Sequence, residues 1–188
     1  MTQTHKRRAD ARTNRDRILA VARDALAMDP AASLHSIAKA AGVGQGTLYR
    51  HFPTRESLVL GIYRDSIDEL VSLAPSLLEA FKPLEAFRRW AERFVDYGRK
   101  KHGVADMLRA AMTDQDFRET YWPMVDAVRL LMDACVDAGE VSKPIDAEDF
   151  LQLLALLTQL PPTAEGTARS ERLLKLAFHG LERRSEDH

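Results

Sequence analysis

The sequence predicts an all-α protein, and three observations lead to that prediction. The 26 alanines and 24 leucines, which favour helices, greatly outnumber the 10 valines and 5 isoleucines that favour strands. Only 9 glycines and 8 prolines occur in 188 residues, so the segments between turns should be long. Apolar residues also recur at spacings of three and four, which places them on one face of a helix.

Four helices are expected in the N-terminal third of the chain. Asp29-Pro30 ends the first helix, and Ser33 is a suitable N-cap for a short second one. Gly42 ends the second helix, and Thr54 can cap the fourth. The expected helices in this part cover residues 14–28, 34–41, 45–51 and 55–73.

Larger helices are expected beyond Pro75. Pro83 suits a first helical turn, and Gly103 suits the left-handed position after a basic C-terminus. Pro123 should kink the third of these helices or split off its first turns, and Asp146 can cap the fourth. The expected helices cover residues 83–102, 104–112, 116–138, 147–160 and 167–183.

The net charge of −1 conceals an uneven distribution of charge. Residues 1–64 carry 11 basic and 5 acidic side chains, whereas the remainder carries 16 basic and 23 acidic ones. The N-terminal third can therefore attract a polyanion that the rest would repel. Arg7, Arg8 and Arg12 are either an arm for the DNA minor groove or a disordered tail.

Several classes of protein lack support in the sequence. The single cysteine, Cys135, excludes a disulfide framework and is expected to be a packed small apolar residue. There is no apolar run long enough for a membrane span and no signal peptide, so a cytoplasmic protein is expected. The six histidines form no metal motif, and no phosphate loop or nucleophile motif occurs. We therefore expect no enzyme activity, no cofactor and no metal.

Residues 33–52 form a helix-turn-helix pattern, in which a short helix, a glycine turn and a helix of matched length follow one another. Such a motif needs a small residue where the helices approach, which Ala38 provides. It also needs a glycine where the chain reverses, Gly42, and an apolar anchor in the turn, Val43. All three are present at suitable spacing.

The second helix of this motif would lie in the DNA major groove with its N-terminal residues at the base edges. Gln45 and Arg50 can form hydrogen bonds to bases, and Thr47 offers a methyl group or a hydroxyl. Gly46 allows close approach. Leu48 and Phe52 share the opposite face and are expected in the core.

At these residues the sequence resembles the TetR (tetracycline-repressor) family of bacterial transcription regulators. The match covers roughly residues 17–63 and is most specific in the run Gly-Val-x-x-Gly-Thr-Leu-Tyr-x-His-Phe at 42–52. The resemblance implies a homodimer with N-terminal three-helix domains that bind a palindromic double-stranded DNA operator. It also implies a larger C-terminal helical domain that binds a small-molecule effector.

The DNA contacts of the family carry over to matching positions of this sequence. Tyr49 and Arg55 would contact phosphates. Two positions depart from the family pattern: Gly44 stands where many members have Ser or Thr, and Arg55 stands where lysine is usual. Arg50 is included because it can form hydrogen bonds to bases. The expected DNA-binding residues are His35, Gln45, Gly46, Thr47, Tyr49, Arg50, His51 and Arg55.

The C-terminal domain offers two further sets of candidates. Aromatic residues with polar tips and nearby apolar residues suggest an effector pocket, although each of them taken singly is more often part of the core. The apolar faces of the last two helices suggest a four-helix dimer interface, although about half of their residues would instead complete a core within the chain. The effector candidates are Trp90, Phe94, Tyr97, Met107, Tyr121 and Trp122, and the interface candidates are Leu153, Leu154, Leu157, Leu174, Phe178 and Leu181.

These inferences combine into one prediction. Residues 1–60 form a helix-turn-helix DNA-binding domain, and residues 61–188 form a helical effector-binding and dimerisation domain. The protein is predicted to repress transcription and to release its operator when the effector binds, while the sequence leaves open whether activation replaces repression. The alternatives are a helical small-molecule carrier or enzyme whose N-terminal domain is structural, or an adaptor that presents residues 45–51 to a partner protein.

Overall fold

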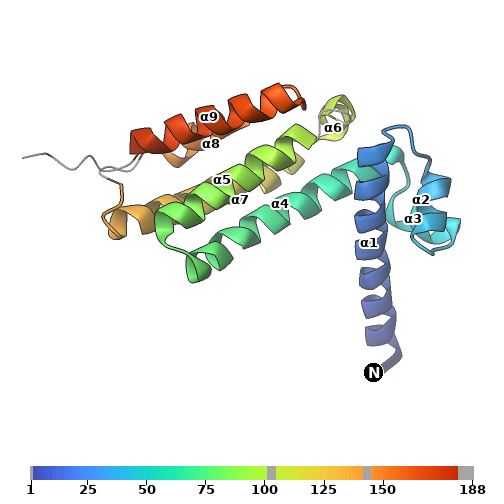
Figure 1. The fold of residues 1–188 in the computed structure, drawn as a ribbon. Helices are drawn as coiled ribbons and strands as arrows, with labels where there is room; N and C mark the ends of the chain where they lie inside the picture. The colour runs from blue at the N-terminus through green and yellow to red at the C-terminus, as the bar shows by residue number, and fades with distance from the viewer. Residues whose placement is uncertain (1, 101–104, 142–144, 182–188) are drawn as a thin grey trace, which may run out of the picture. The chain divides into compact units, whose positions relative to one another are not determined.

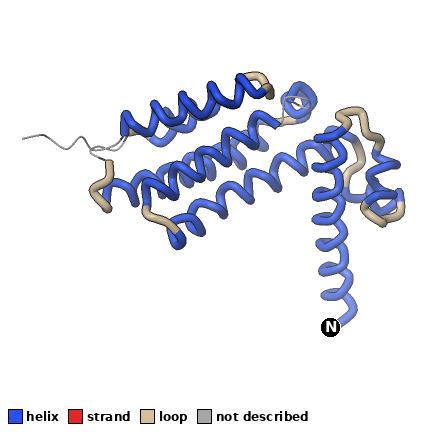
Figure 2. The backbone as a smooth tube through the Cα atoms, viewed as in Figure 1, coloured by secondary structure: helices blue, strands red, loops and turns tan. Residues whose placement is uncertain are grey.

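The computed structural model describes residues 2–100, 105–141 and 145–181, whose backbone consists of helices joined by short loops (Figure 1 and Figure 2). No strand occurs in these ranges, and the all-α class is confirmed. The helices are α1 Thr2–Met28, α2 Leu34–Ala40, α3 Gln45–His51, α4 Arg55–Ala80, α5 Pro83–Lys100, α6 Ala105–Ala111, α7 Asp114–Asp137, α8 Ala147–Leu157 and α9 Ala164–Leu181.

The chain forms two compact units, each of which is described by itself. The N-terminal unit comprises Met1–Ser66 with Gly103–Thr113, and the C-terminal unit comprises Ile67–His102 with Asp114–His188. Helix α6 therefore belongs to the N-terminal unit, where Leu108 is buried in the apolar core. The sequence assigned this segment to the second domain because periodicity does not tell which core a short helix joins. The domain limits 1–60 and 61–188 stay predictions.

The core of the N-terminal unit consists of apolar side chains from several of its helices. Ile18 and Leu19 of α1, Leu48 of α3 and Leu58 of α4 have no exposed surface. Helix α1 begins at Thr2, well before the predicted start at residue 14, so the backbone at Arg7, Arg8 and Arg12 is helical. The side chains of these three arginines lie outside the described part, and their role as a minor-groove arm stays a prediction.

The turn between α2 and α3 has the predicted local chemistry. The Ser33 hydroxyl accepts a backbone hydrogen bond in the first turn of α2. Gly42 has a φ of 63°, and its N–H donates to the Lys39 carbonyl at 3.1 Å. The Val43 N–H donates to the Ala38 carbonyl at 3.0 Å. This pair of bonds satisfies the last carbonyls of α2 and fixes the direction in which the chain enters α3.

Helix α4 is longer than predicted, because it continues through Pro75 to Ala80. A proline inside a helix removes one N–H donor, which usually ends the helix. Pro75 is exposed, so water can reach the side of the helix where the hydrogen bond is missing. The predicted break near this proline was therefore wrong.

The core of the C-terminal unit contains a cluster of aromatic rings. The ring of Phe87 lies 5.0 Å from that of Phe150 and 5.2 Å from that of Phe178. Trp90 has no exposed surface, and its indole N–H donates to the Leu70 carbonyl of α4 at 2.8 Å. A buried indole is stable here because its one donor has a partner.

The remaining helices of the C-terminal unit begin and end largely as predicted. Helix α7 continues across Pro123 without splitting and ends at Asp137, two residues before Gly139, which has a φ of 71°. The Asp146 carboxylate accepts from two N–H groups at the start of α8. The predicted left-handed Gly103 lies outside the described residues. Within the described ranges, no helix is long and apolar enough to cross a bilayer.

Candidate nucleic-acid interface and ligand groove

Helix α3 is fixed to the N-terminal unit by one face only. Leu48 is fully buried, and Phe52, which caps the C-terminus of the helix, is 3% exposed. At the other end, the Gly44 carbonyl accepts from the Thr47 and Leu48 N–H groups at 2.9 and 3.1 Å. Because Leu48 and Phe52 are four residues apart, they face the core together and leave the other face of α3 outside.

The outward face of α3 carries most of the predicted DNA-binding residues. Gln45, Gly46, Tyr49 and Arg50 are exposed, and Tyr49 retains 47% of its surface. A Cβ atom at Gly46 would meet nothing within 4 Å, so the backbone is open there. Thr47 and His51 are half-buried at the sides of this face.

Two of the polar side chains on this face are oriented by neighbours within the unit. The Gln45 amide nitrogen contacts Nδ1 of His35, an exposed residue of α2. Arg50 lies along its own helix, where it donates to the Gly46 carbonyl and to the Thr47 hydroxyl, each at 3.1 Å. The structure therefore brings His35 and Gln45 together and holds Arg50 beside Thr47.

Arg55 forms hydrogen bonds within the N-terminal unit, and the phosphate contact that the resemblance implies stays a prediction. Its two terminal nitrogens donate to the carbonyls of Ala32 and Pro30, in the loop between α1 and α2. The guanidinium therefore joins the start of α4 to this loop. Because a guanidinium presents several donors in a fixed fork and an ammonium does not, arginine suits this role better than the lysine usual in the family.

We expect Arg55→Lys to destabilise the protein almost as much as Arg55→Ala, by about 1–3 kcal/mol, since neither restores both hydrogen bonds. Urea unfolding of the three proteins, followed by circular dichroism, measures the difference. Arg64→Lys, at another half-buried arginine of α4, is the control for arginine-to-lysine replacement. Full stability of Arg55→Lys would show that the charge at this position matters and the fork does not.

The first turn of α4 is closed by a reciprocal cap. The Ser57 N–H donates to the Thr54 hydroxyl and the Thr54 N–H donates to the Ser57 hydroxyl, both at 3.1 Å. Hydrogen bonding to its own backbone N–H, and then to Thr54, lowers the pKa of the Glu56 carboxyl. The ionised carboxylate also interacts favourably with the N-terminal end of α4.

The six predicted effector residues lie on three helices, α5, α6 and α7. Met107 packs with the core of the N-terminal unit. Trp90 is buried in the C-terminal unit with its ring stacked 5.7 Å from that of Phe94, and Tyr97 is half-buried on the same helix. The other two lie on α7: the Tyr121 hydroxyl donates to Glu148 at 2.8 Å, and Trp122 is 48% exposed. Their effector role stays a prediction.

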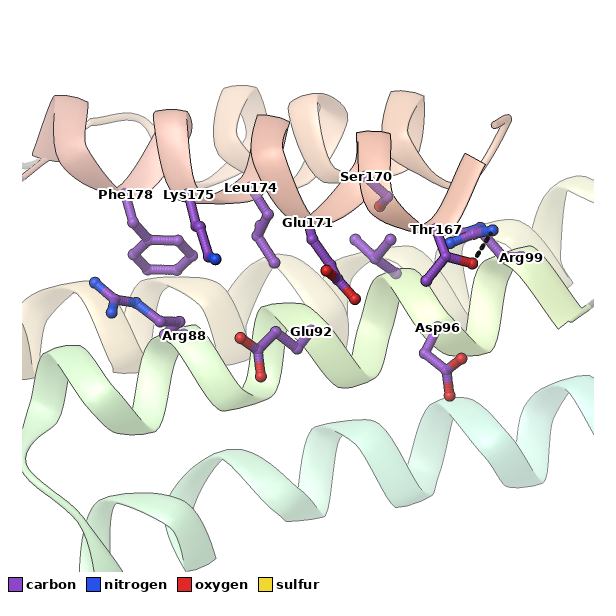
Figure 3. A pocket seen from close by; sticks show the side chains of 11 residues that line it. Arg88, Glu92, Asp96, Arg99, Thr167, Ser170, Glu171, Leu174, Lys175 and Phe178 are labelled. Atoms are coloured by element: carbon purple, nitrogen blue, oxygen red, sulfur yellow. Dashed lines mark hydrogen bonds between the residues drawn. The ribbon is translucent and has the colours of Figure 1, made fainter. Parts of the chain in front are cut away.

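A groove of about 560 Å³ runs between α5 and α9 in the C-terminal unit (Figure 3). None of the six predicted effector residues lines it. The sequence pattern does not indicate this groove, because its charged residues are indistinguishable from ordinary solvated side chains in the sequence. The available signal was the spacing of Ser170, Leu174 and Phe178, which places a hydroxyl and two apolar side chains on one ridge of α9.

Burial changes the interpretation of the predicted dimer interface. Among the six candidates only Leu153 is exposed, at 40%, whereas the other five are at most 6% exposed and pack inside the chain. They are buried because α8 and α9 turn these faces toward the rest of their own unit. The large apolar side chains that α8 and α9 expose are Leu153, Leu156, Leu173 and Leu176.

The described residues contain no group of His, Cys, Asp and Glu side chains that could hold a metal ion. Cys135 is fully buried, and desolvation, with a smaller contribution from Glu140, raises the pKa of its thiol to about 12. The thiol is therefore protonated at neutral pH and is a poor nucleophile.

Two family models match the chain. Residues 18–62 match the model of bacterial regulatory proteins of the tetR family, and residues 82–183 match the C-terminal domain of SbtR-like transcriptional regulators. The first match contains α2, α3 and the exposed face described above. A comparison with curated protein sequences finds no match.

Solved structures match this chain over nearly its whole length. The TetR transcriptional regulator SCO0520 from Streptomyces coelicolor is 38% identical, with a TM-score of 0.79, and the match covers 91% of this chain and 99% of that one. A TetR regulatory protein from Mycobacterium vanbaalenii is 30% identical, with a TM-score of 0.75 and coverage of 94% and 99%. RolR, solved with resorcinol, is 17% identical, with a TM-score of 0.61 and coverage of 94% and 91%.

Proposed function

The chain belongs to the TetR family of transcriptional regulators, and from that premise we propose that it is a repressor that binds a palindromic operator as a homodimer and releases it when a small molecule binds. Proteins of this family are generally not enzymes. A regulator of this kind works on the chromosome, so we expect it in the cytoplasm. The observation that supports DNA binding most directly is the exposed face of α3, with Gln45, Tyr49 and Arg50 outside and Leu48 inside.

In this proposal, α3 enters the major groove and two kinds of contact follow. Gln45 is the residue that reads a base edge, since it stands at the N-terminal end of the helix and its amide can form hydrogen bonds to a base. Tyr49 contacts a phosphate, which gives affinity without sequence information. The excess of basic over acidic side chains in residues 1–64 adds attraction to DNA of any sequence.

The dimer is proposed to form through the exposed leucines of α8 and α9. These four side chains are large and apolar, and a second copy would remove them from water. Two copies related by a two-fold axis present the same face to each other. Such a dimer carries two reading helices, which fit one side of B-DNA when they lie about 34–36 Å apart.

Effector release follows from two conformations of the dimer. A small molecule that binds the non-DNA-binding conformation more tightly shifts the population toward it, by an amount set by the difference in affinity. RolR, which has the same fold, was solved with resorcinol. That precedent supports a small-molecule effector for this chain and says nothing of its chemistry.

The test is site selection from random DNA, followed by affinity measurements at increasing salt. A dimer with six to ten phosphate contacts should lose roughly 10³–10⁵ in affinity between 50 and 200 mM salt. Gln45→Ala should relax the preference at one base pair of each half-site, whereas Tyr49→Ala should weaken all sequences alike. If the wild-type protein selects no sequence and binds no DNA at low salt, a carrier or enzyme replaces the regulator.

A further inference from the structure

The groove between α5 and α9 combines an apolar floor with polar walls. Along α9, Ser170, Leu174 and Phe178 follow one another at intervals of four residues, and all three are buried. Val95 of α5, 4% exposed, completes the apolar lining. Figure 3 shows Ser170, Leu174 and Phe178 directed from α9 toward α5. The volume of about 560 Å³ is within the range of small-molecule sites.

The hydroxyl of Ser170 is the first sign of a ligand. Ser170 is only 4% exposed, and its hydroxyl forms no hydrogen bond with the residues that the structure describes. A donor or acceptor bound beside this hydroxyl would form a hydrogen bond that no described residue provides. Because Ser170 lines the groove, a molecule in the groove can supply that partner.

Two of the basic side chains in the groove interact with neighbouring residues, although the Nε atom of each is buried without a hydrogen bond to any described residue. Arg99 donates to the Pro161 carbonyl at 2.9 Å and to the Thr167 hydroxyl at 2.8 Å. Arg88 lies over the ring of Phe178, with 5.6 Å between the guanidinium carbon and the ring centroid. Lys175 is exposed, so its long stem lets the ammonium group remain in water.

Acidic side chains also line the groove, and they come from both helices. Glu92 of α5 and Glu171 of α9 line the groove from opposite helices, and neither forms an ion pair or hydrogen bond with any described residue. Asp96, one turn further along α5, also lines the groove, but Figure 3 shows its carboxylate directed away from α9. Two carboxylates, one from each helix, and the hydroxyl of Ser170 are therefore available as hydrogen-bond acceptors in this stretch of the groove.

We propose that this groove is the effector site and that its ligand is an amphipathic primary amine, with the ammonium group among Glu92, Glu171 and Ser170 and an apolar chain along Leu174 and Phe178. The effector role rests on the proposed function as a regulator, whereas binding of the amine does not. A primary ammonium group carries three donors and no acceptor, which matches a carboxylate from each wall and one hydroxyl.

The dimensions of the ridge set the size of the apolar part. Ser170 and Phe178 are eight residues apart, which at 1.5 Å per residue is about 12 Å along α9. An extended octyl chain has a comparable length. Octylammonium is therefore a suitable probe, while octanoate has the same chain with the opposite charge and octan-1-ol has the same chain without charge.

The experiment is isothermal titration of the full chain with these three probes. Octylammonium should bind saturably, octan-1-ol at least tenfold more weakly, and octanoate not detectably. The double variant Glu92→Gln and Glu171→Gln should lose at least tenfold in affinity for octylammonium, and Ser170→Ala a few-fold. Glu79→Gln, at an exposed carboxylate of α4 outside the groove, should bind as wild type does.

Each of the other outcomes overturns the proposal. Equal binding of octylammonium and octanoate, or binding unchanged in the double variant, would mean that the carboxylates do not form the site. If octylammonium binds through these residues and leaves operator affinity unchanged, the effector role is wrong. Failure of the protein to bind DNA without any amine is a separate result, because it contradicts the proposed function and leaves the titration unaffected.

Discussion

A chain carrying Leu156→Asp and Leu176→Asp should be monomeric and should bind its operator at least about 100-fold more weakly than the wild-type protein, because a monomer loses the gain from engaging two half-sites at once. Each of these leucines is 68% exposed, so the fold of one chain does not depend on burying them. In a dimer, a charge at either position would be taken out of water without a partner. Analytical ultracentrifugation and operator titration measure the two effects.

The control for this prediction is Met28→Asp, which places the same charge at a side chain that is 90% exposed in the N-terminal unit. This variant should remain a dimer. Circular dichroism should show unchanged helicity for the double leucine variant, since neither position is in the core. A dimer that survives both leucine substitutions would move the interface away from α8 and α9.

Phe52→Ala should have the largest effect on stability, a loss of about 3–5 kcal/mol in the free energy of unfolding, as expected when a buried phenylalanine is truncated. Phe52 is 3% exposed and caps α3. Arg15 of α1 lies over its ring, 5.7 Å from the centroid. Removing the ring should therefore loosen the attachment of α3 to the unit and abolish operator binding as well. Chemical denaturation and operator titration test both.

Gly61 provides a sharper test of the same packing. A Cβ atom on Gly61 would lie 2.7 Å from Cε1 of Phe52 and 3.2 Å from Cδ2 of Leu19. Gly61→Ala should therefore cost about 1–3 kcal/mol through overpacking. In a Phe52→Leu background the smaller side chain leaves room, so the same change should cost much less. Additive effects in this double-mutant cycle would show that the ring and Gly61 do not constrain each other.

The sequence predicted local structure well wherever one residue type decides the backbone. Ser33, Gly42, Gly139 and Asp146 occupy the caps and left-handed positions expected of them, because these roles depend on the chemistry of a few neighbouring residues. Pro75 is the exception. Its effect depends on whether water reaches the helix at that point, which the tertiary structure determines.

The position of Arg55 and the true exposure of the leucines were beyond sequence reasoning for another reason. Arg55 bonds to carbonyls more than twenty residues away, and no local pattern records such a pairing. On α8 and α9, leucines are too numerous for the pattern to separate the inward face from the outward one. Leu154 is fully buried and Leu156, two residues later, is 68% exposed.

By itself, the sequence determined the all-helical class, the helix-turn-helix with its glycine turn, and the outward face of α3, since these follow from helix propensity, capping and four-residue spacing within one segment. The tertiary structure alone decided that α6 joins the N-terminal core, that Arg55 is held by a distant loop, and that a groove lined by charged side chains lies between α5 and α9. Those features arise where segments distant in sequence pack together, and the free energy of that packing depends on both partners at once.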